Sequence, residues 1–146
     1  MSTEENMAIV RRYTEEGWGK QNLAVVDELV ATDMIDHNPI EAMHQYQGAE
    51  GVKSTIRSLQ SAFPHFSVTI IDDLLADKDQ VAIRWIIRGT HQGTLMGIAP
   101  TGKSISFSGV NIYRLAGGKI VEESGMVDIA GLLHQLGALP TPGPAS

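Results

Sequence analysis

The sequence predicts an α+β fold in which N-terminal helices cover one face of a curved antiparallel sheet. Two observations lead to it. Up to Phe63 the apolar residues recur at helical spacing, and from Phe66 onward they alternate with polar residues as in strands. Short turns such as Gly117-Gly118 join the later segments, which is typical of antiparallel hairpins. Helices followed by hairpin-linked strands indicate one layer of helices on one sheet.

Three helices are expected before the sheet. The first covers residues 3–19 and ends among glycines, and the second follows at 23–30. The third runs from 48 to 63, where Pro64 stops it. Between the second and third helices, residues 33–46 are polar and irregular. The apolar stripes of these helices consist of Met7, Val10, Thr14, Trp18, Leu23, Val26, Leu29, Val30, Val52, Ile56, Leu59 and Phe63.

The strands that follow are predicted from alternation of apolar and polar residues. In the strand that begins at Ser104 the apolar phase slips at Gly109. One extra residue there would invert the side chains that follow, so a β-bulge is predicted at this glycine. The four expected strands lie at 66–70, at 81–88, from 104 onward and at 119–126.

The remaining segments complete a single domain. A glycine-rich loop is expected at 91–102, before the third strand, and a short closing helix at 129–136. No internal repeat is visible, so we expect one domain over residues 1–139. The Pro, Gly and Ala residues of 140–146 predict a flexible tail.

Composition limits the classes of partner. The formal net charge is −6, which disfavours nucleic acids because their affinity for proteins depends on Lys and Arg contacts to phosphates. No apolar run approaches the roughly 20 residues that span a bilayer, and the acidic N-terminus lacks the layout of a secretory signal. We therefore expect no membrane attachment. The absence of cysteine excludes disulfides and thiolate metal sites and leads us to expect a cytoplasmic protein.

No metal or cofactor is expected. The five histidines show no ligand spacing of the HxH or HExxH type. Gly93, Gly97 and Gly102 precede a strand instead of opening a helix, so they do not form a phosphate-binding loop. The expected partner is a hydrophobic small-molecule substrate, held in a pocket between the helices and the curled sheet.

Several motifs resemble a known family. They are Gly89-Thr90-His91-Gln92-Gly93, the stretch from Gly97 to Lys103, Gly118-Lys119-Ile120-Val121-Glu122, and Asp128-Ile129-Ala130-Gly131-Leu132-Leu133. With Trp18 and the His37-Asn38-Pro39 region, they make the chain resemble the SnoaL-like polyketide cyclases over most of its length. The resemblance implies a cone-shaped fold of the nuclear-transport-factor-2-like superfamily that encloses an apolar pocket. It also implies a homo-oligomer, either a dimer or a tetramer.

The resemblance further implies a reaction. The founding cyclases of the family close a polyketide ring by intramolecular aldol condensation, without metal or cofactor. Their general base is an aspartate at the position that matches Asp128. Two departures from their pattern stand out: the histidine that partners the aspartate is matched by Arg114, and a tryptophan of many relatives is matched by Ser124.

Asp128 has two interpretations. It directly precedes the apolar-periodic segment that starts at Ile129, and an aspartate there can cap the helix by accepting backbone hydrogen bonds. The resemblance favours a catalytic base instead. A base that works at neutral pH would need apolar surroundings, which Met126, Val127 and Ile129 could provide in part.

Other residues complete the expected site. His91 either donates a hydrogen bond to a carbonyl oxygen and stabilises the enolate, or is an exposed loop histidine. Trp18 and Trp85 are expected to wall the pocket from the core. Phe107 and Met126 complete the expected lining.

Three polar residues remain ambiguous. His37 and Asn38 either line the mouth of the pocket or form a turn. Arg114 either binds a substrate carboxylate or pairs with Glu122 across neighbouring strands.

The leading hypothesis is a cofactor-independent enzyme that deprotonates a carbon next to a carbonyl group, with Asp128 as base and His91 as donor. An isomerase, hydrolase or dehydratase, or a non-catalytic small-molecule-binding or dimerisation module, stays open. An enclosed cavity that contains Asp128 and a donor would favour catalysis. If Asp128 faces the N-terminus of its own helix, the binding module is favoured.

Overall fold

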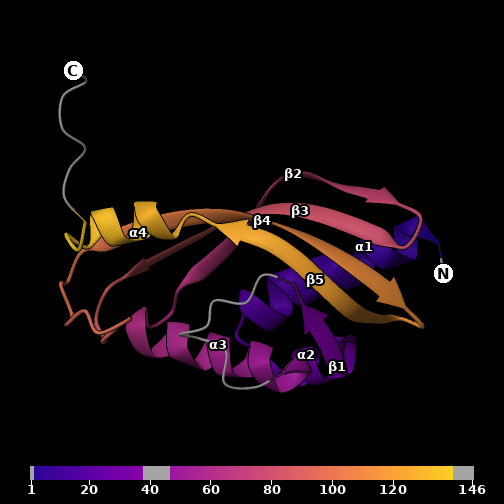
Figure 1. Ribbon diagram of the computed structural model, residues 1–146, viewed down its shortest axis with the longest axis horizontal. Coiled ribbons are helices and arrows are strands. Elements are labelled where there is room, and N and C mark those ends of the chain that lie inside the picture. Colours follow the sequence, from indigo (N-terminus) through magenta and orange to yellow (C-terminus); the bar gives the residue numbers. More distant parts are fainter. Residues whose placement is uncertain (1, 38–46, 140–146) are drawn as a thin grey trace.

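A computed structural model describes residues 2–37 and 47–139 of the chain. Helices pack against one face of a sheet, which confirms the predicted α+β fold (Figure 1). Within these residues, no helix is both long and apolar enough to cross a membrane. In chain order the elements are α1 (Thr3–Arg12), a π-helical segment η1 (Tyr13–Trp18), α2 (Leu23–Leu29), β1 (Val30–Asp36), α3 (Gly48–Ala62), β2 (Ser67–Asp77), β3 (Gln80–Thr90), β4 (Ser104–Ala116), β5 (Lys119–Val127) and α4 (Ile129–Gln135).

The first helix begins with a capping box. The Oγ of Ser2 accepts a hydrogen bond from the backbone N–H of Glu5 at 3.1 Å, and the Glu5 carboxylate accepts one from the N–H of Ser2. The chain passes without a break from α1 into η1, which closes with the N–H of Gly19 donating to the carbonyl of Thr14 at 2.9 Å. The predicted helix over 3–19 is confirmed in extent, with a π-helical last turn. Such turns are frequent at functional sites.

The segment after α2 is a strand, where the sequence predicted polar and irregular chain. β1 pairs in parallel with β5, with Val30 opposite Ile120 and Asp36 opposite Glu123. The other four strands are antiparallel as predicted, so the sheet is mixed, in the order β1-β5-β4-β3-β2. The register of β1 shifts between Val30 and Ile35, which blurs the alternation and hides the strand in the sequence.

The predicted bulge at Gly109 is absent. β4 pairs with β3 in unbroken register from Ser104 to Arg114, so Phe107 and Gly109 both face the helices. The apolar side chain of Val110 simply points outward, away from the helices, and is 44% exposed. The phase slip in the sequence therefore arises because apolar residues also lie on the outer face of β4. No residue is inserted.

A bulge lies in β5 instead. Arg114 of β4 is opposite Glu122, and the next residue of β4, Leu115, is opposite Ile120, so the pairing skips Val121. A skipped residue inverts the side chains that follow it. Glu123, Gly125 and Val127 of β5 consequently point toward the helices.

The core fills the space between the helices and the inner face of the sheet. Its fully buried members come from every layer, including Val10 of α1, Ile56 of α3 and Val81 of β3. Each such aliphatic side chain stabilises the fold by about 1.5–3 kcal/mol when it leaves water. A cavity remains between the helices and the inner face of the sheet.

Candidate active site

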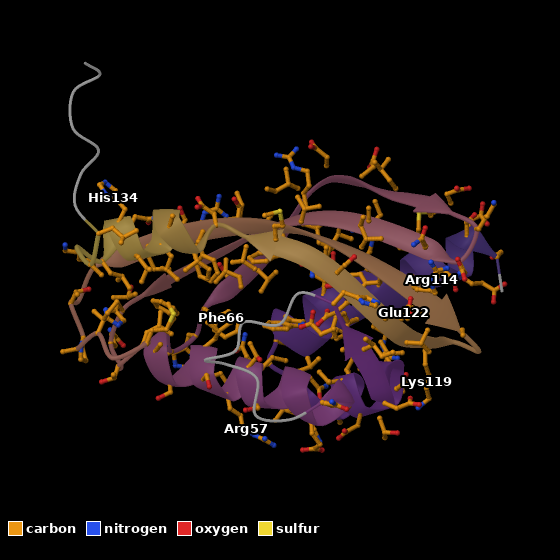
Figure 2. All side chains as sticks on the ribbon, in the orientation of Figure 1. Arg57, Phe66, Arg114, Lys119, Glu122 and His134 are labelled. Atoms are coloured by element: carbon orange, nitrogen blue, oxygen red, sulfur yellow. The ribbon has the colours of Figure 1, made fainter. Side chains whose placement is uncertain are left out.

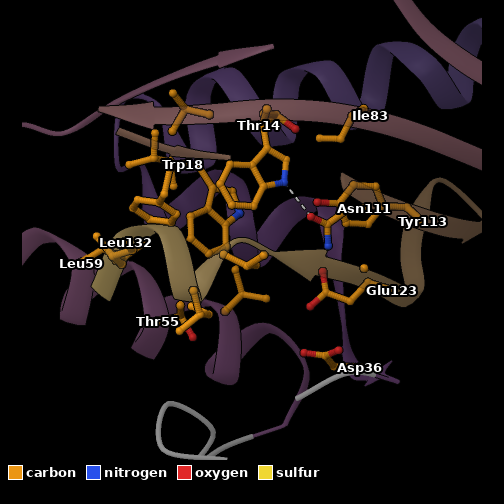
Figure 3. A pocket seen from close by; sticks show the side chains of 18 of the residues that line it. Thr14, Trp18, Asp36, Thr55, Leu59, Ile83, Asn111, Tyr113, Glu123 and Leu132 are labelled. Atoms are coloured by element: carbon orange, nitrogen blue, oxygen red, sulfur yellow. Dashed lines mark hydrogen bonds between the residues drawn. The ribbon is translucent and has the colours of Figure 1, made fainter. Parts of the chain in front are cut away.

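A cavity of about 220 Å³ lies between the inner face of the sheet and the helices (Figure 3). Most of its wall is apolar, and several aromatic rings contribute to it. The polar side chains in the wall are few: Thr14, Asp36, Thr55, Asn111 and Glu123. An apolar cavity with a few convergent polar groups is the usual form of a small-molecule site.

Two carboxyl groups face each other at one end of this cavity. The side chains of Asp36, at the end of β1, and Glu123, in β5, share a hydrogen bond. Burial first, and then the charge and hydrogen bond of Asp36, raise the pKa of Glu123 to about 8. Glu123 therefore holds a proton at neutral pH. The two residues Asp36 and Glu123 are called the acidic pair below.

Two buried tyrosines lie beside the acidic pair. Tyr13 and Tyr113 pack edge to face, with ring centroids 5.7 Å apart, and neither is exposed. Burial above all raises the pKa of both phenols well above the ordinary value. At the high pH where phenols titrate, the charge of Glu123 adds to the effect on Tyr13, and the charges of Tyr13 and then Glu123 add to the effect on Tyr113. Both tyrosines are therefore neutral, and only the two carboxyl groups exchange protons at this end of the cavity.

Asn111 of β4 faces the cavity next to the acidic pair. Its Oδ1 accepts a hydrogen bond from the indole Nε1–H of Trp85 at 2.7 Å (Figure 3). The inner positions beside these two residues are glycines. A Cβ on Gly109 would lie 2.3 Å from the Trp85 ring, and a Cβ on Gly125 would lie 2.7 Å from the Nδ2 of Asn111. The two glycines leave the room that both side chains need.

Comparison with protein families decides the membership of this chain. The family described as SnoaL-like polyketide cyclase matches residues 8–136. The chain belongs to this family.

The relatives of this SnoaL-like protein include cyclases and a protein named for other chemistry. Aklanonic acid methyl ester cyclase DnrD of Streptomyces peucetius is 25% identical over 97% of both chains. IdmH of Streptomyces antibioticus, named as a candidate polyketide cyclase, is 29% identical with a TM-score of 0.77, over 90% of this chain and 98% of its own. AclR of Streptomyces galilaeus, named as a candidate hydroxylase, is 25% identical with a TM-score of 0.80, over 96% of this chain and 89% of its own.

Three of the predicted site residues line the cavity of this SnoaL-like protein. They are Trp18, Trp85 and Phe107. The Trp85 ring meets Phe107 edge to face, with centroids 5.9 Å apart. Their contact with a substrate stays a prediction.

Asp128 lies outside the cavity wall. Its side chain is exposed at the N-terminus of α4, and its Oδ1 accepts a hydrogen bond from the N–H of Gly131 at 2.9 Å. The neighbours Val127 and Ile129 point into the cavity, whereas Asp128 does not. The geometry is that of the helix cap, and the expected carboxylate in the cavity is supplied by Glu123 instead.

His91 is also outside the cavity wall, although it is fully buried. Its Nδ1 accepts a hydrogen bond from the N–H of Thr101 at 3.1 Å, and its ring packs against Phe63 with centroids 5.6 Å apart. Since Nδ1 is an acceptor, the neutral ring carries its hydrogen on Nε2. Nε2 has no partner among the described residues. His91 therefore holds the loop that follows β3 in place, and the alternative of an exposed loop histidine is wrong. Its hydrogen bond to a substrate carbonyl stays a prediction.

Arg114 and Met126 both point away from the cavity. The Nε of Arg114 is 2.9 Å from the Glu122 carboxylate, and its Nη1 is 2.8 Å from Asp79 (Figure 2). The contact with Glu122 is the cross-strand pairing that the sequence allowed, and Asp79 is a second carboxylate partner. Met126 is 80% exposed on the outer face, because the bulge in β5 inverts its direction.

The remaining predicted residues belong to the segment after β1. The side chain of His37 is about half exposed, with Nε2 3.9 Å from Glu122, and it does not line the cavity. Asn38 lies outside the described residues. In the part of the chain that the structure describes, no cluster of three or more His, Asp or Glu side chains could hold a metal ion.

The sequence interpretation missed the acidic pair and Asn111. A signal existed for Asn111, since regular alternation from Ile105 and Phe107 places it on the inner face. Glu123 could not be found in this way, because strict alternation from Ile120 predicts it to point outward. Asp36 was hidden by the irregular register of β1.

Proposed function

We propose that this SnoaL-like protein is an enzyme that removes a proton from the carbon next to a carbonyl group of a hydrophobic small molecule and closes a ring by an aldol-type step. One observation carries the proposal: the carboxyl groups of Asp36 and Glu123 share a hydrogen bond in the wall of the apolar cavity. The acidic pair takes the role that the resemblance gave to Asp128.

The acidic pair can supply a base and an acid at the same time. In the proposed step the carboxylate of Asp36 takes the proton from carbon, and the electrons of the C–H bond form the enolate. The enolate carbon attacks a second carbonyl group of the same molecule, and a C–C bond forms. Glu123 gives its proton to the oxygen of that carbonyl, which becomes a hydroxyl. The proton on Asp36 then crosses the hydrogen bond to Glu123 and restores the pair.

The apolar wall supports this chemistry in two ways. It binds and folds a hydrophobic substrate, and orientation alone can lower such a barrier by several kcal/mol, up to about 7–11. It also keeps the Glu123 carboxyl out of water, which is the largest cause of its raised pKa. Proton donors work best when their pKa lies near the working pH.

The experiment uses 2-tetralone, a bicyclic ketone, in D2O. NMR measures how fast the protons next to its carbonyl group are replaced by deuterium. The wild-type protein should accelerate exchange above the buffer rate. Asp36→Asn should lower this acceleration by about 10²–10⁴-fold, the range for loss of one general base. Asp128→Asn, which keeps the helix cap, should exchange like the wild type. Thermal shift with 2-tetralone checks that each variant still binds it.

Two outcomes would overturn the assignment. Loss of exchange in Asp128→Asn, with full exchange in Asp36→Asn, would return the base to Asp128. If the wild type binds 2-tetralone but exchanges its protons no faster than buffer, the non-catalytic binding module is favoured. The position of Asp128, taken alone, would also favour that module. The fold does not decide between these functions.

A further inference from the structure

We propose that Asn111 is the hydrogen-bond donor to the carbonyl oxygen that becomes the enolate, and that Trp85 is the positioning residue that sets its direction. The inference rests on the proposed function and deepens it, since it names a residue and the group of the substrate that this residue binds.

The chemistry of Trp85 fixes the amide of Asn111. An indole N–H can only donate a hydrogen bond, so the Asn111 atom at 2.7 Å from Nε1 is the carbonyl oxygen Oδ1. The Nδ2 group then points to the opposite side. Figure 3 shows it directed toward the end of the cavity where Glu123 and Asp36 lie. The wall thus presents an N–H donor beside the acidic pair.

Packing prevents the amide from turning away. Trp85 and Asn111 both lie on the inner face, where Trp85 is opposite Gly109 and Asn111 is opposite Gly125. The indole fills the space above Gly109, and it is held from the side by Phe107. The amide fills the space above Gly125. Each glycine is required, because a side chain at either position would occupy the volume of its neighbour.

The donor and the acidic pair divide the reaction between them. When Asp36 takes the proton from carbon, negative charge moves to the carbonyl oxygen. An N–H group that already points to this place stabilises the charge without reorganising, which is how oxyanion sites act. Glu123 stays available for the second carbonyl.

The first test measures catalysis. Asn111→Leu keeps the approximate size of the side chain and removes the donor. We expect kcat for 2-tetralone exchange to fall about 10²–10³-fold, the usual loss for one oxyanion donor. KM should stay within about threefold, because the interaction strengthens only as charge develops. Trp85→Phe should lower kcat by a smaller factor, since the amide remains but is no longer oriented. Ser108→Ala, an exposed position of the same strand, is the matched control.

The second test does not depend on catalysis. 2-Naphthol and naphthalene differ by one hydroxyl oxygen, and their binding can be followed by fluorescence. The wild type should prefer 2-naphthol, and Asn111→Leu should reduce that preference about fivefold, the effect of one hydrogen bond, without weakening naphthalene. Asn111→Leu could lose the preference for 2-naphthol while the wild-type protein shows no exchange of 2-tetralone above the buffer rate. In that case the donor exists and the proposed reaction is wrong.

The outcome that overturns the proposal is equally definite. If Asn111→Leu and Trp85→Phe keep both the wild-type kcat and the preference for 2-naphthol, Asn111 does not contact the substrate oxygen. If Asn111→Leu does not fold, as judged by circular dichroism, Trp85→Phe decides through its preference for 2-naphthol over naphthalene. This ratio is used because Trp85 also forms part of the cavity wall, so binding of both probes can change together.

Discussion

Ile120 and Glu123 of β5 point to the same face of the sheet, although regular alternation would place them on opposite faces. Ile120 is buried in the core, and Glu123 lines the cavity. The cause is the skipped residue Val121 between them. One inserted residue thus brings a carboxyl group into an apolar cavity, where burial and Asp36 favour its protonated form.

The first prediction concerns stability. The pKa of Glu123 is raised from 4.5 to about 8, so between these pH values the folded protein binds a proton that the unfolded chain does not. The stability from this group is fully present below pH 4.5 and is lost as the pH rises to about 8, at up to about 1.4 kcal/mol per pH unit. Glu123→Gln should remove this loss and be more stable than the wild type at pH 8. Urea unfolding at pH 5, 6, 7 and 8 measures the free energy of unfolding of the wild type and of Glu123→Gln. The prediction is contradicted if this free energy changes with pH by the same amount in both proteins.

The second prediction concerns the rate. The proposed ring closure needs a proton on Glu123 for the second carbonyl group, so kcat/KM for the cyclisation of a diketone such as 2,6-heptanedione should fall as the pH rises through about 8. Glu123→Gln should be slower at pH 7, and its profile should show no fall near pH 8. If the fall of kcat/KM near pH 8 persists in Glu123→Gln, it belongs to the titration of another group.

The fold was predictable because most elements follow local rules. The pairing of β3 with β4 has no register shift, so alternation along each strand places Trp85 and Phe107 on the inner face, where both line the cavity. The acidic pair depends on two non-local events, a bulge in β5 and parallel pairing of β1 to the same strand. Neither leaves a local pattern. For the same reason, Met126 was predicted to line the pocket, whereas Glu123 was overlooked.

The third prediction separates capping from catalysis at Asp128. Because its Oδ1 accepts the N–H of Gly131, Asp128→Ala should destabilise the protein by about 1 kcal/mol. Asp128→Asn should stay within a few tenths of a kcal/mol, since asparagine caps equally well. Urea unfolding of the three proteins tests this. Equal losses in both variants would show that the charge matters more than the cap.

The fourth prediction concerns the loop after β3. Its residues Leu95 and Met96 line the cavity, and His91 fastens it through the N–H of Thr101. His91→Phe leaves that N–H without an acceptor and should destabilise the protein by about 1–3 kcal/mol. Hydrogen exchange at the Thr101 amide should accelerate. His134→Phe, at an exposed histidine, is the control. Unchanged protection at Thr101 in His91→Phe would show that the imidazole does not fasten the loop.

The last prediction follows from the outer face of the sheet, where apolar side chains are exposed on neighbouring strands. Val110 is opposite Met126, and Ile112 is opposite Ala82, which in turn is opposite Leu75. Arg84 opposite Val110 and Ser124 opposite Ile112 interrupt this face, but exposed apolar side chains gathered on neighbouring strands are typical of interfaces. We expect a homo-oligomer that buries it.

Two lysines on this face, Val110→Lys with Ile112→Lys, should turn the oligomer into a monomer in sedimentation velocity. The side chains point away from the cavity, so binding of 2-tetralone should persist. The matched control places lysines at Ser58 and Ser61, two exposed positions of α3. This variant should leave the oligomer intact. The face is not an interface if the wild type sediments as a monomer, or if the control dissociates as well. In the latter case added charge alone, acting through repulsion between copies, would explain the change.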